Sequence, residues 1–420
     1  MEHILFIEAT TTGAGLAGIK YARSENMHVS FFTRNKNQYI NNQPKEQCIL
    51  EHVGEVFDIN TNDEREVINA ARLLNNKKRI TAITTFADFY VPVAAAAAEA
   101  LGLKTIPYNA ASLARNKFLM RQRLLEVDAD LNPAFTLAST FDDCLNFAFT
   151  NGYPFVLKPQ NDNDGYNVML INNEASLKTE FEKLSSISSN RIGQRPQNNG
   201  VLLEDYINAQ EYSVETVYLD DSNSHELIGI TRKYVSGVSR GRFIEIGHCF
   251  PVEDHIKIIE KGVKRALNAL GIINAVCHTE VKVVNNSIKI IEINPRLAGG
   301  GIGSDLIPLA LGLDPIKLAI DLVRRPLGRS DIDKLYSKGA AIYKYESNIN
   351  GYIRRTPQIP IDSTIVKVDF NISTGQKVIV PERNGDLLGT VYAVSETASQ
   401  AFTLAKAVVE DNPFVIEYIE

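Results

Sequence analysis

Apolar and polar positions in the first part of the chain follow a strand–helix alternation. The runs HILFI, HVSFFT and ITAITT are each short and apolar, as buried strands are. The first run continues through a glycine-containing turn into a helical segment, and an Ala-rich helix after the third run ends near Gly102. Strands that alternate with helices favour an α/β arrangement. We therefore predict a small open α/β domain over residues 1–110.

Residues 111–326 show a different pattern, in which strands are joined by polar turns. A charged amphipathic helix over Ala110–Val127 comes first. PFVLKP, the polar QNDNDGYN and VMLI then predict a hairpin with a flexible tip. Further strands are predicted at EYSVETVYL, ELIGIT, FIEIGHCF, AVCHTEVKVV and SIKIIEIN, with a helix over Asp254–Leu270. We predict an α+β domain over 111–326 with a mobile lid at about 133–205, and an α+β subdomain over 327–420 that packs on it.

Composition places the chain among globular proteins. Of 420 residues, 44% are hydrophobic and 22% are charged, and this length suits two to four packed subdomains. The net charge of −6 gives no electrostatic support to nucleic-acid binding. Four scattered cysteines without a CxxC pair favour buried reduced thiols. No apolar run reaches the length of about 18 residues that a membrane span needs, so we expect no membrane association and a cytoplasmic location.

Gly13, Gly15 and Gly18 form a GxGxxG pattern after the first strand. A dinucleotide site also needs an acidic residue about 20 positions further on, near the end of the second strand. Arg34 stands there in HVSFFTRNKN, and no acid does. We therefore favour a tight strand–helix turn, with a dinucleotide site as the alternative.

The segment CHTEVKVVNNSIKIIEINPR predicts a β-hairpin that carries two glutamates. A three-residue loop at Asn285–Ser287 would place Val284 opposite Ile288 and Glu280 opposite Glu292, and asparagine suits the left-handed position that such a loop needs. Two carboxylates directly opposite one another repel. A glutamate in an apolar strand is also costly unless something pairs with it. The hairpin therefore indicates a site for a cation.

The same hairpin supplies a third oxygen ligand. Asn294 shares a strand face with Glu292, because side chains two positions apart point the same way. Oxygen ligands without histidine or cysteine suit Mg²⁺, which commonly binds through a few carboxylates and phosphate oxygens. We predict that Glu280, Glu292 and Asn294 bind the metal, and the alternative is a solvated sheet edge with ordinary charged residues.

A metal of this kind calls for a polyphosphate and for cationic side chains. Lys158 ends the strand in PFVLKP, and Lys117 lies in the helix ARNKFLMRQRLL; either one alone is an ordinary solvated charge. Together with the acids they belong to five motifs that occur in the order and spacing of one family. The motifs are NK at 116–117, VLKP at 156–159, LLEDYINAQEYSVE at 202–215, HTEVKV at 278–283 and EINPR at 292–296.

On these motifs the chain resembles the ATP-grasp enzymes, most clearly over residues 111–326. The resemblance implies an N-terminal α/β domain, a two-lobed nucleotide clamp and a C-terminal α+β segment. It implies ATP as cofactor with one or two Mg²⁺ ions, for which Mn²⁺ could substitute. The implied contacts are Lys117 and Lys158 on phosphates, Gly165 in the phosphate loop, Glu204, Asp205, Tyr206 and Ile207 along the adenine, Glu211 on the ribose, and Glu280, Glu292 and Asn294 on the metal.

The phosphate loop departs from the family pattern. It reads QNDNDGYNV at 160–168, with Gly165 where serine is common and Asn167 where glycine is common. Asparagine tolerates a positive φ better than most residues, so a backbone cradle for phosphate can persist. Asp162 and Asp164 in the same loop do not favour a phosphate.

Within the family the chain is most similar to the L-amino acid ligases, which form dipeptides or related amides. The segment ITTFAD suggests that Asp88 binds the substrate ammonium, although Asp88 could instead cap the helix at Phe89. RFIEIGHCFP is similar to the segment in which a glutamate and a histidine contact substrate, which implies Glu245 and His248 here. The alternative for His248 is an ordinary half-buried histidine.

The segment after the second glutamate completes the implied substrate site. Arg296 would be the catalytic residue and would meet the substrate carboxylate or acyl phosphate, because its planar guanidinium suits that shape. Ala298 and Gly299 would line the pocket, where the glycines let backbone approach the substrate closely. Gly300 stands where these ligases can carry a bulky residue, which implies a roomier pocket.

The resemblance implies a carboxylate–amine ligase. Such an enzyme activates a carboxylate as an acyl phosphate, joins it to an amine, and releases ADP and phosphate. We expect small carboxylates and amines as partners, most of all amino acids, with a role in dipeptide or secondary-metabolite synthesis. A homodimer is compatible with the resemblance.

Three alternatives stay open. A biotin-carboxylase-like enzyme would bring a biotinyl carrier, and no MKM-type acceptor occurs here. A purine-pathway enzyme would call for extra basic residues in the first domain, where we identify no such cluster. A non-catalytic ATP-binding protein would not need the complete set of Glu280, Glu292, Asn294, Lys117, Lys158 and Arg296.

Overall fold

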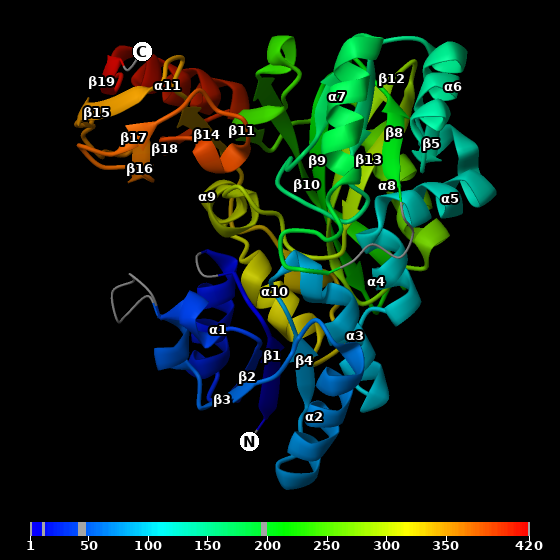
Figure 1. The fold of residues 1–420 in the computed structure, drawn as a ribbon. Coiled ribbons are helices and arrows are strands. Elements are labelled where there is room, and N and C mark those ends of the chain that lie inside the picture. Colours follow the sequence, from blue (N-terminus) through cyan, green and yellow to red (C-terminus); the bar gives the residue numbers. More distant parts are fainter. Residues whose placement is uncertain (1, 11–12, 41–47, 195–199, 419–420) are drawn as a thin grey trace.

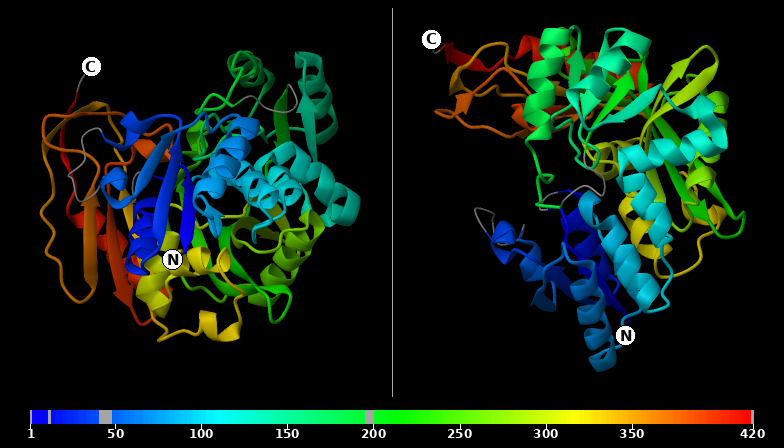
Figure 2. Two further views of the ribbon diagram at one scale, coloured as in Figure 1. Left: turned by 90° about the horizontal axis from the view of Figure 1, so that it is seen from below. Right: turned by 45° about the vertical axis from the view of Figure 1, so that its right-hand side comes forward.

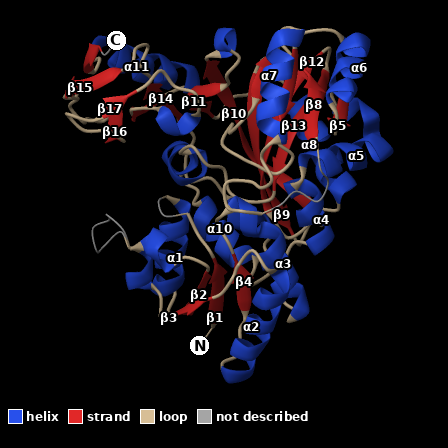
Figure 3. Ribbon diagram, viewed as in Figure 1, coloured by secondary structure: helices blue, strands red, loops and turns tan. Residues whose placement is uncertain are grey.

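The computed structural model describes residues 2–10, 13–40, 48–194 and 200–418. It contains a four-stranded N-terminal sheet, an eight-stranded central sheet, a second four-stranded sheet and a small three-stranded sheet (Figures 1 and 3). None of the described helices is both long and apolar enough to cross a bilayer. The four cysteines are buried and free, as predicted. The predicted combination of α/β and α+β parts is confirmed.

The N-terminal sheet is parallel, with strand order β3-β2-β1-β4. Ile4 and Phe6 of β1 pack into the core on the α1 side, whereas Leu5 and Ile7 pack into a second core with α2 and α3. Because both faces are covered, the strand is apolar at successive positions. The elements are β1 (His3–Ile7), α1 (Ala14–Ser24), β2 (His28–Thr33), β3 (Glu55–Asp58), α2 (Glu64–Lys77), β4 (Ala82–Thr84) and α3 (Val91–Ala100).

The glycines of the GxGxxG pattern allow close packing at the start of α1. Gly13 has a φ of 63°. A Cβ on Gly15 would lie 2.2 Å from the carbonyl oxygen of Thr10, and a Cβ on Gly18 would lie 2.3 Å from Cε2 of Phe86. These approaches support the tight strand–helix turn that we favoured.

Two helices, α4 (Tyr108–Arg115) and α5 (Lys117–Asp128), replace the single predicted helix over Ala110–Val127. That prediction was wrong because the backbone is extended at Asn116. The Asn116 side chain accepts hydrogen bonds from the N–H groups of Phe118 and Leu119 and thereby starts α5. The break places Lys117 in the first turn of the new helix.

The second four-stranded sheet is antiparallel and has its own core. The predicted hairpin is confirmed, since Phe155 pairs with Ile171 and Leu157 with Met169. We call this sheet and its two helices the lid sheet. Its elements are β5 (Phe135–Ala138), α6 (Phe141–Asn151), β6 (Phe155–Lys158), β7 (Met169–Ile171), α7 (Glu174–Ser185) and β8 (Val201–Asp205).

The central sheet has the strand order β13-β12-β9-β10-β11-β14-β18-β16. Three of its strands come from beyond residue 327 and continue the sheet without a break, so the C-terminal part is built onto the same layer. The strands are β9 (Glu211–Leu219), β10 (Ser224–Ser236), β11 (Ile244–Phe250), β12 (Val276–Val284), β13 (Ser287–Asn294), β14 (Gly339–Tyr345), β16 (Ile365–Phe370) and β18 (Gly389–Ser395).

Helices cover this sheet and connect it to the N-terminal sheet. Helix α8 (Ile256–Leu270) buries one apolar face in a core with β12 and β13. Helices α9 (Ile307–Leu311) and α10 (Pro315–Leu322) share a core with β1 and β2. In the left view of Figure 2 the yellow helices of this region lie next to the blue N-terminal part. The remaining elements are a π-helical turn at Ile302–Leu306, α11 (Ala398–Asp411), the small sheet β17 (Lys377–Val378), β15 (Gly351–Arg355) and β19 (Val415–Tyr418), and 3₁₀ turns at Lys36–Tyr39, Ile49–His52, Asp88–Tyr90, Ala129–Leu131, Val238–Arg240, Arg329–Ile332 and Asn384–Asp386.

Candidate active site

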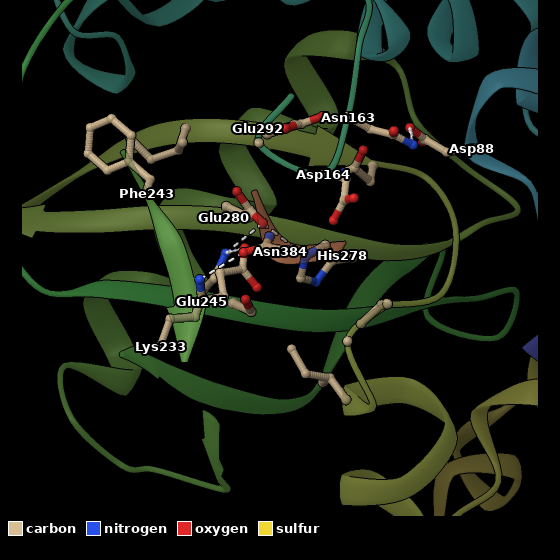
Figure 4. A pocket seen from close by; sticks show the side chains of 18 of the residues that line it. Asp88, Asn163, Asp164, Lys233, Phe243, Glu245, His278, Glu280, Glu292 and Asn384 are labelled. Atoms are coloured by element: carbon tan, nitrogen blue, oxygen red, sulfur yellow. Dashed lines mark hydrogen bonds and ion pairs between the residues drawn. The ribbon is translucent and has the colours of Figure 1, made fainter. Parts of the chain in front are cut away.

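A cavity of about 930 Å³ lies where the N-terminal sheet, the lid sheet and the central sheet meet. Figure 4 shows acidic and basic side chains gathered in this cavity. Of the residues predicted for the site, His248 is the exception that does not line the cavity. The others do: Asp88, Lys117, Lys158, Gly165, Glu204, Asp205, Tyr206, Ile207, Glu211, Glu245, Glu280, Glu292, Asn294, Arg296, Ala298 and Gly299.

Glu280 and Glu292 are paired directly across β12 and β13, as the sequence predicts. The predicted loop is wrong, because Val284 pairs with Ser287 and leaves a turn of only Asn285 and Asn286, whose φ values are 49° and 59°. Two left-handed residues are what a tight two-residue hairpin turn needs. A bulge between Glu280 and Val281 then shifts the register by one residue and restores the glutamate pair.

Each of these two glutamates is held by a cation. Nζ of Lys117 donates to Oε1 of Glu292 at 3.0 Å, and Nζ of Lys233 donates to Oε1 of Glu280 at 2.8 Å. Burial alone would raise the pKa of Glu280, but Lys233 and His278 hold it well below its usual range. The repulsion expected between facing carboxylates is therefore balanced by lysines in this structure.

Lys233 of β10 is the centre of an acidic cluster that the sequence did not reveal. Its Nζ lies 2.8 Å from carboxylate oxygens of Glu211, Glu245 and Glu280, which come from three different strands (Figure 4). Burial would lower the pKa of Lys233, but the three carboxylates raise it well above its usual value. The sequence signal for this cluster was the position of Lys233 in the strand segment that precedes Gly237, because a buried strand lysine needs counter-ions.

His278 of β12 is a second site residue that the sequence did not reveal. Its Nδ1 lies 2.6 Å from Oε1 of Glu215, and its Nε2 lies 3.3 Å from Oε1 of Glu280. Burial would lower its pKa, but the two glutamates raise it to about 9. The imidazolium consequently donates to both carboxylates and orients Glu280.

Glu204 fixes Lys158 at the lid side of the cavity. Nζ of Lys158 lies 2.7 Å from Oε2 of Glu204, and Arg121 donates to both oxygens of the same carboxylate at 2.8 and 3.2 Å. Burial would raise the pKa of Glu204, but Arg121 and Lys158 lower it to about 2. The sequence suggested a backbone role for Glu204, and the structure adds this side-chain role and the unpredicted Arg121.

The segment implied for adenine runs from the end of β8 towards β9. The carbonyl of Ile207 accepts a hydrogen bond of 2.9 Å from Nζ of Lys282, which also lies 5.3 Å from the ring centre of Tyr206. Glu211, the residue implied for ribose, faces both Lys233 and Lys282. Lys282 and Tyr206 thus form part of the cavity wall beside this segment.

The phosphate loop has the backbone that its sequence allowed. Asn167 has a φ of 56°, beside Asp164 at 61° and Gly165 at 66°, so the expected positive φ at Asn167 is confirmed. Arg191, which the sequence did not single out, lies 3.3 Å from Asp162 and 3.5 Å from Asp164. This arginine offsets the two carboxylates that seemed out of place in a phosphate loop.

Asp88 does not cap a helix, so the capping alternative is wrong. The 3₁₀ turn at Asp88–Tyr90 starts from Ala87 with no side-chain cap. Oδ1 of Asp88 instead accepts a 3.1 Å hydrogen bond from Nε of Arg296, and Oδ2 accepts one of 3.3 Å from Nδ2 of Asn163. Burial would raise the pKa of Asp88, but Arg115, Arg296 and Lys117 hold it well below its usual range.

His248 lies behind the cavity wall and supports Glu245. It is completely buried, which corrects the half-buried alternative, and Nε2 lies 3.1 Å from Oε2 of Glu245. Burial lowers its pKa to about 4, so the ring is neutral and donates through Nε2. Within the described residues its Nδ1 has no hydrogen-bond partner. The predicted contact of His248 with substrate stays a prediction, and in this structure the residue that reaches the cavity is Glu245, which His248 holds.

The three residues predicted to bind the metal lie together in the cavity. Glu280 in the middle of β12 faces Glu292 of β13, and Asn294 ends the same strand β13; all three line the cavity. Hard oxygen donors of this kind suit Mg²⁺. No group of three or more acidic, histidine or cysteine side chains in the described part of the chain is arranged as a metal site. Two carboxylates and one amide are below that number, and phosphate oxygens usually complete such a sphere. The donor chemistry fits the ion.

Residues 151–305 match the family model of the ATP-grasp domain. The curated alanine–anticapsin ligase of Bacillus amyloliquefaciens is 25% identical over 360 residues, which are 81% of this chain and 72% of that protein. The formate-dependent phosphoribosylglycinamide formyltransferase of Sulfurisphaera tokodaii is 23% identical over 350 residues, 81% of this chain and 83% of that protein.

Among solved structures, an L-amino acid ligase from Bacillus licheniformis superposes with a TM-score of 0.80 and 19% identity, covering 99% of both chains. At this identity the likeness is one of fold, and it extends over all the sheets described above. The fold, the matched domain and the ligase relative agree with the five motifs. Residues 151–305 therefore form an ATP-grasp domain, and the chain as a whole is similar to ADP-forming carbon–nitrogen ligases, among them the L-amino acid ligases.

Proposed function

We propose that the protein joins two amino acids, or an amino acid and a related acid or amine, by way of an acyl phosphate. The observation that carries this proposal is the ion pair of Asp88 and Arg296 at the end of the cavity next to Glu292. An amino acid brings one ammonium and one carboxylate. It can therefore replace the pair by giving its ammonium to Asp88 and its carboxylate to Arg296.

The exchange is favourable because neither protein charge is left unpaired. Asp88 and Arg296 are largely buried, with exposed side-chain fractions of 6% and 17%, and Asp88 is the carboxylate that pairs with Arg296. A ligand that met only Asp88 would therefore leave the buried guanidinium of Arg296 without a counter-ion. A simple carboxylic acid or a simple amine is therefore a poorer fit than a zwitterion. This selects amino acids over other small acids for the activated position.

The remaining residues can be ordered around the reacting atoms. Lys117 and Lys158 would face the phosphates of ATP, and Glu280, Glu292 and Asn294 would hold Mg²⁺, which when bound offsets phosphate charge. A carboxylate oxygen of the substrate attacks the γ-phosphorus, and the bond to ADP breaks. The guanidinium of Arg296 then faces the acyl phosphate. The amine of the second substrate displaces phosphate, loses a proton and leaves an amide.

The first experiment is phosphate release from Mg-ATP with a matrix of amino-acid pairs, followed by mass spectrometry of the positive mixtures. We expect release that needs two amino acids and a product one water lighter than their sum. Formate and bicarbonate, each with a phosphoribosyl amine, form a second set of assays because a formyltransferase is among the relatives. Release in that set, and none with amino acids, would replace the proposal with a purine-type reaction.

A last control separates catalysis from nucleotide binding. ATP binding is measured by calorimetry on the same preparation. Binding without phosphate release under any condition would support a non-catalytic ATP-binding protein instead.

A further inference from the structure

The cations that line the cavity are paired, with one exception in the described part of the chain. Lys117, Lys158, Lys233 and Lys367 each lie within 3.0 Å of a carboxylate oxygen. Lys344 of β14 lines the same cavity and has neither an ion pair nor a hydrogen bond of its ammonium among the described residues. A cation turned into a cavity without a counter-ion is poised for an anionic ligand.

Lys344 lies beside Gly300, which directly follows the residues implied for the substrate. A Cβ on Gly300 would lie 4.0 Å from Nζ of Lys344 and 3.2 Å from Cε1 of His248, so a side chain at this position would crowd the wall beside the ammonium, and glycine avoids that. Burial lowers the pKa of Lys344, with Glu245 acting in the opposite direction and Lys233 adding to the decrease. Nearby carboxylates thus influence Lys344 without forming an ion pair with it.

In a two-substrate ligase the second substrate brings a negative charge that the cations already assigned to ATP and to the first substrate do not pair with. The amino acid that attacks through its amine keeps its own carboxylate, which needs a cation once it is inside the cavity. Arg296 is matched to the first substrate, and Lys117 and Lys158 are matched to phosphates under the proposed function. Lys344 is the cation that remains.

We propose that Lys344 binds the unreacted carboxylate of the second, amine-bearing substrate. The inference rests on the proposed function for the identity of that substrate. It makes Lys344 a specificity-determining residue that favours amino acids over plain amines and over amino acid amides.

A direct test does not depend on turnover. The full-length protein is treated briefly with acetic anhydride, with and without individual L-amino acids or the corresponding amino acid amides, and acetylation of Lys344 is measured by peptide mass spectrometry. We expect one or more amino acids to protect Lys344 and their amides to give no protection. Exposed Lys377 is the internal control, whose acetylation should stay constant. No protection by any amino acid, or equal protection by acid and amide, would overturn the proposal.

A kinetic test uses Lys344→Met beside Lys344→Arg and the matched Lys377→Met. Loss of a charge-assisted contact should raise KM for the amine-bearing amino acid about 10- to 100-fold. KM for its amide and for ATP should change by less than about twofold, and arginine should restore part of the preference. An equal loss for acid and amide would show that Lys344 does not read the carboxylate. Protection in the labelling test without any ligase activity would leave the carboxylate site standing and reject the proposed function.

Discussion

Arg296 and Asp88 are 208 positions apart in the chain, yet they share a hydrogen bond of 3.1 Å. The bond joins the turn Asp88–Tyr90, which follows β4 of the N-terminal sheet, to the segment that follows β13 of the central sheet. Asp88 also accepts from Asn163 of the phosphate loop, so one carboxylate contacts both the substrate side and the phosphate side of the cavity.

Replacing Asp88 by asparagine tests the ammonium role. The amide keeps the shape but cannot pair with an ammonium, so KM for the activated amino acid should rise about 10- to 100-fold. Affinity for ATP should change little, which calorimetry would check. Asp333→Asn, at an exposed position, is the matched control. An unchanged KM in Asp88→Asn would reject the ammonium contact.

Replacing Glu292 by glutamine tests the metal and phosphate role. Glu292 faces Glu280 across the hairpin and is contacted by Lys117. The change removes one of the two facing negative charges, so ADP formation should fall by at least about 100-fold. The unfolding temperature should stay near that of the parent, as circular dichroism can show. Glu253→Gln, on an exposed residue, should be fully active. Parent-level turnover in Glu292→Gln would contradict the assignment.

Asn167 offers a test of the phosphate loop through its backbone. Its φ of 56° is costly for a β-branched residue, by about 1–2 kcal/mol, and costs glycine nothing. Asn167→Val should therefore raise KM for ATP about tenfold, whereas Asn167→Gly should stay within about twofold. If valine were tolerated as well as glycine, the loop backbone would not be what cradles phosphate.

The buried side chain of His225, which does not line the cavity, should make the free energy of unfolding depend on pH. Burial lowers its pKa from 6.5 to about 4, while its Nε2 lies 3.0 Å from the carbonyl oxygen of Ile272. Below pH 6.5 the unfolded chain takes up a proton that the folded chain refuses, so the free energy of unfolding should fall as the pH drops from 6.5 towards 4. The loss should reach about 1.4 kcal/mol per pH unit.

His225→Gln should remove this contribution, which urea unfolding at several pH values would measure. The slope between pH 6.5 and 4 should decrease by about one proton in the variant relative to the parent. Identical slopes would show that His225 is protonated in the folded protein.

The hairpin of β12 and β13 shows what the sequence could and could not predict. The facing of Glu280 and Glu292 was predicted from a three-residue loop, yet it arises from a two-residue turn and a bulge. Strand alternation fixes which residues share a face, but a bulge depends on how the strand bends over its neighbours. The wrong loop length and the missed bulge offset each other, so the predicted pairing of Glu280 with Glu292 was still correct.

Long-range partners were the part that a single sequence does not reveal. Lys233 and Arg191 belong to no spaced motif, and His278 begins the HTEVKV motif without a role of its own in it. Each acquires its role from nearby carboxylates that the motif spacing does not place. The same holds for His248, whose position behind Glu245 follows from packing in the central sheet and not from the RFIEIGHCFP motif. The break at Asn116, in contrast, was readable as a cap followed by a lysine.

The continuous central sheet limits how this chain can be divided. Strand β14, the first to follow residue 327 in the central sheet, pairs with β11 from Gly247 to Phe250. A fragment that stopped before β14 would leave those backbone groups of β11 unpaired and would uncover Phe250, which is completely buried. Bare strand edges recruit other chains. The part of the chain beyond residue 327 therefore covers a strand edge of the central sheet. Recombination between related genes should tolerate crossovers near residue 110 better than crossovers near residue 330.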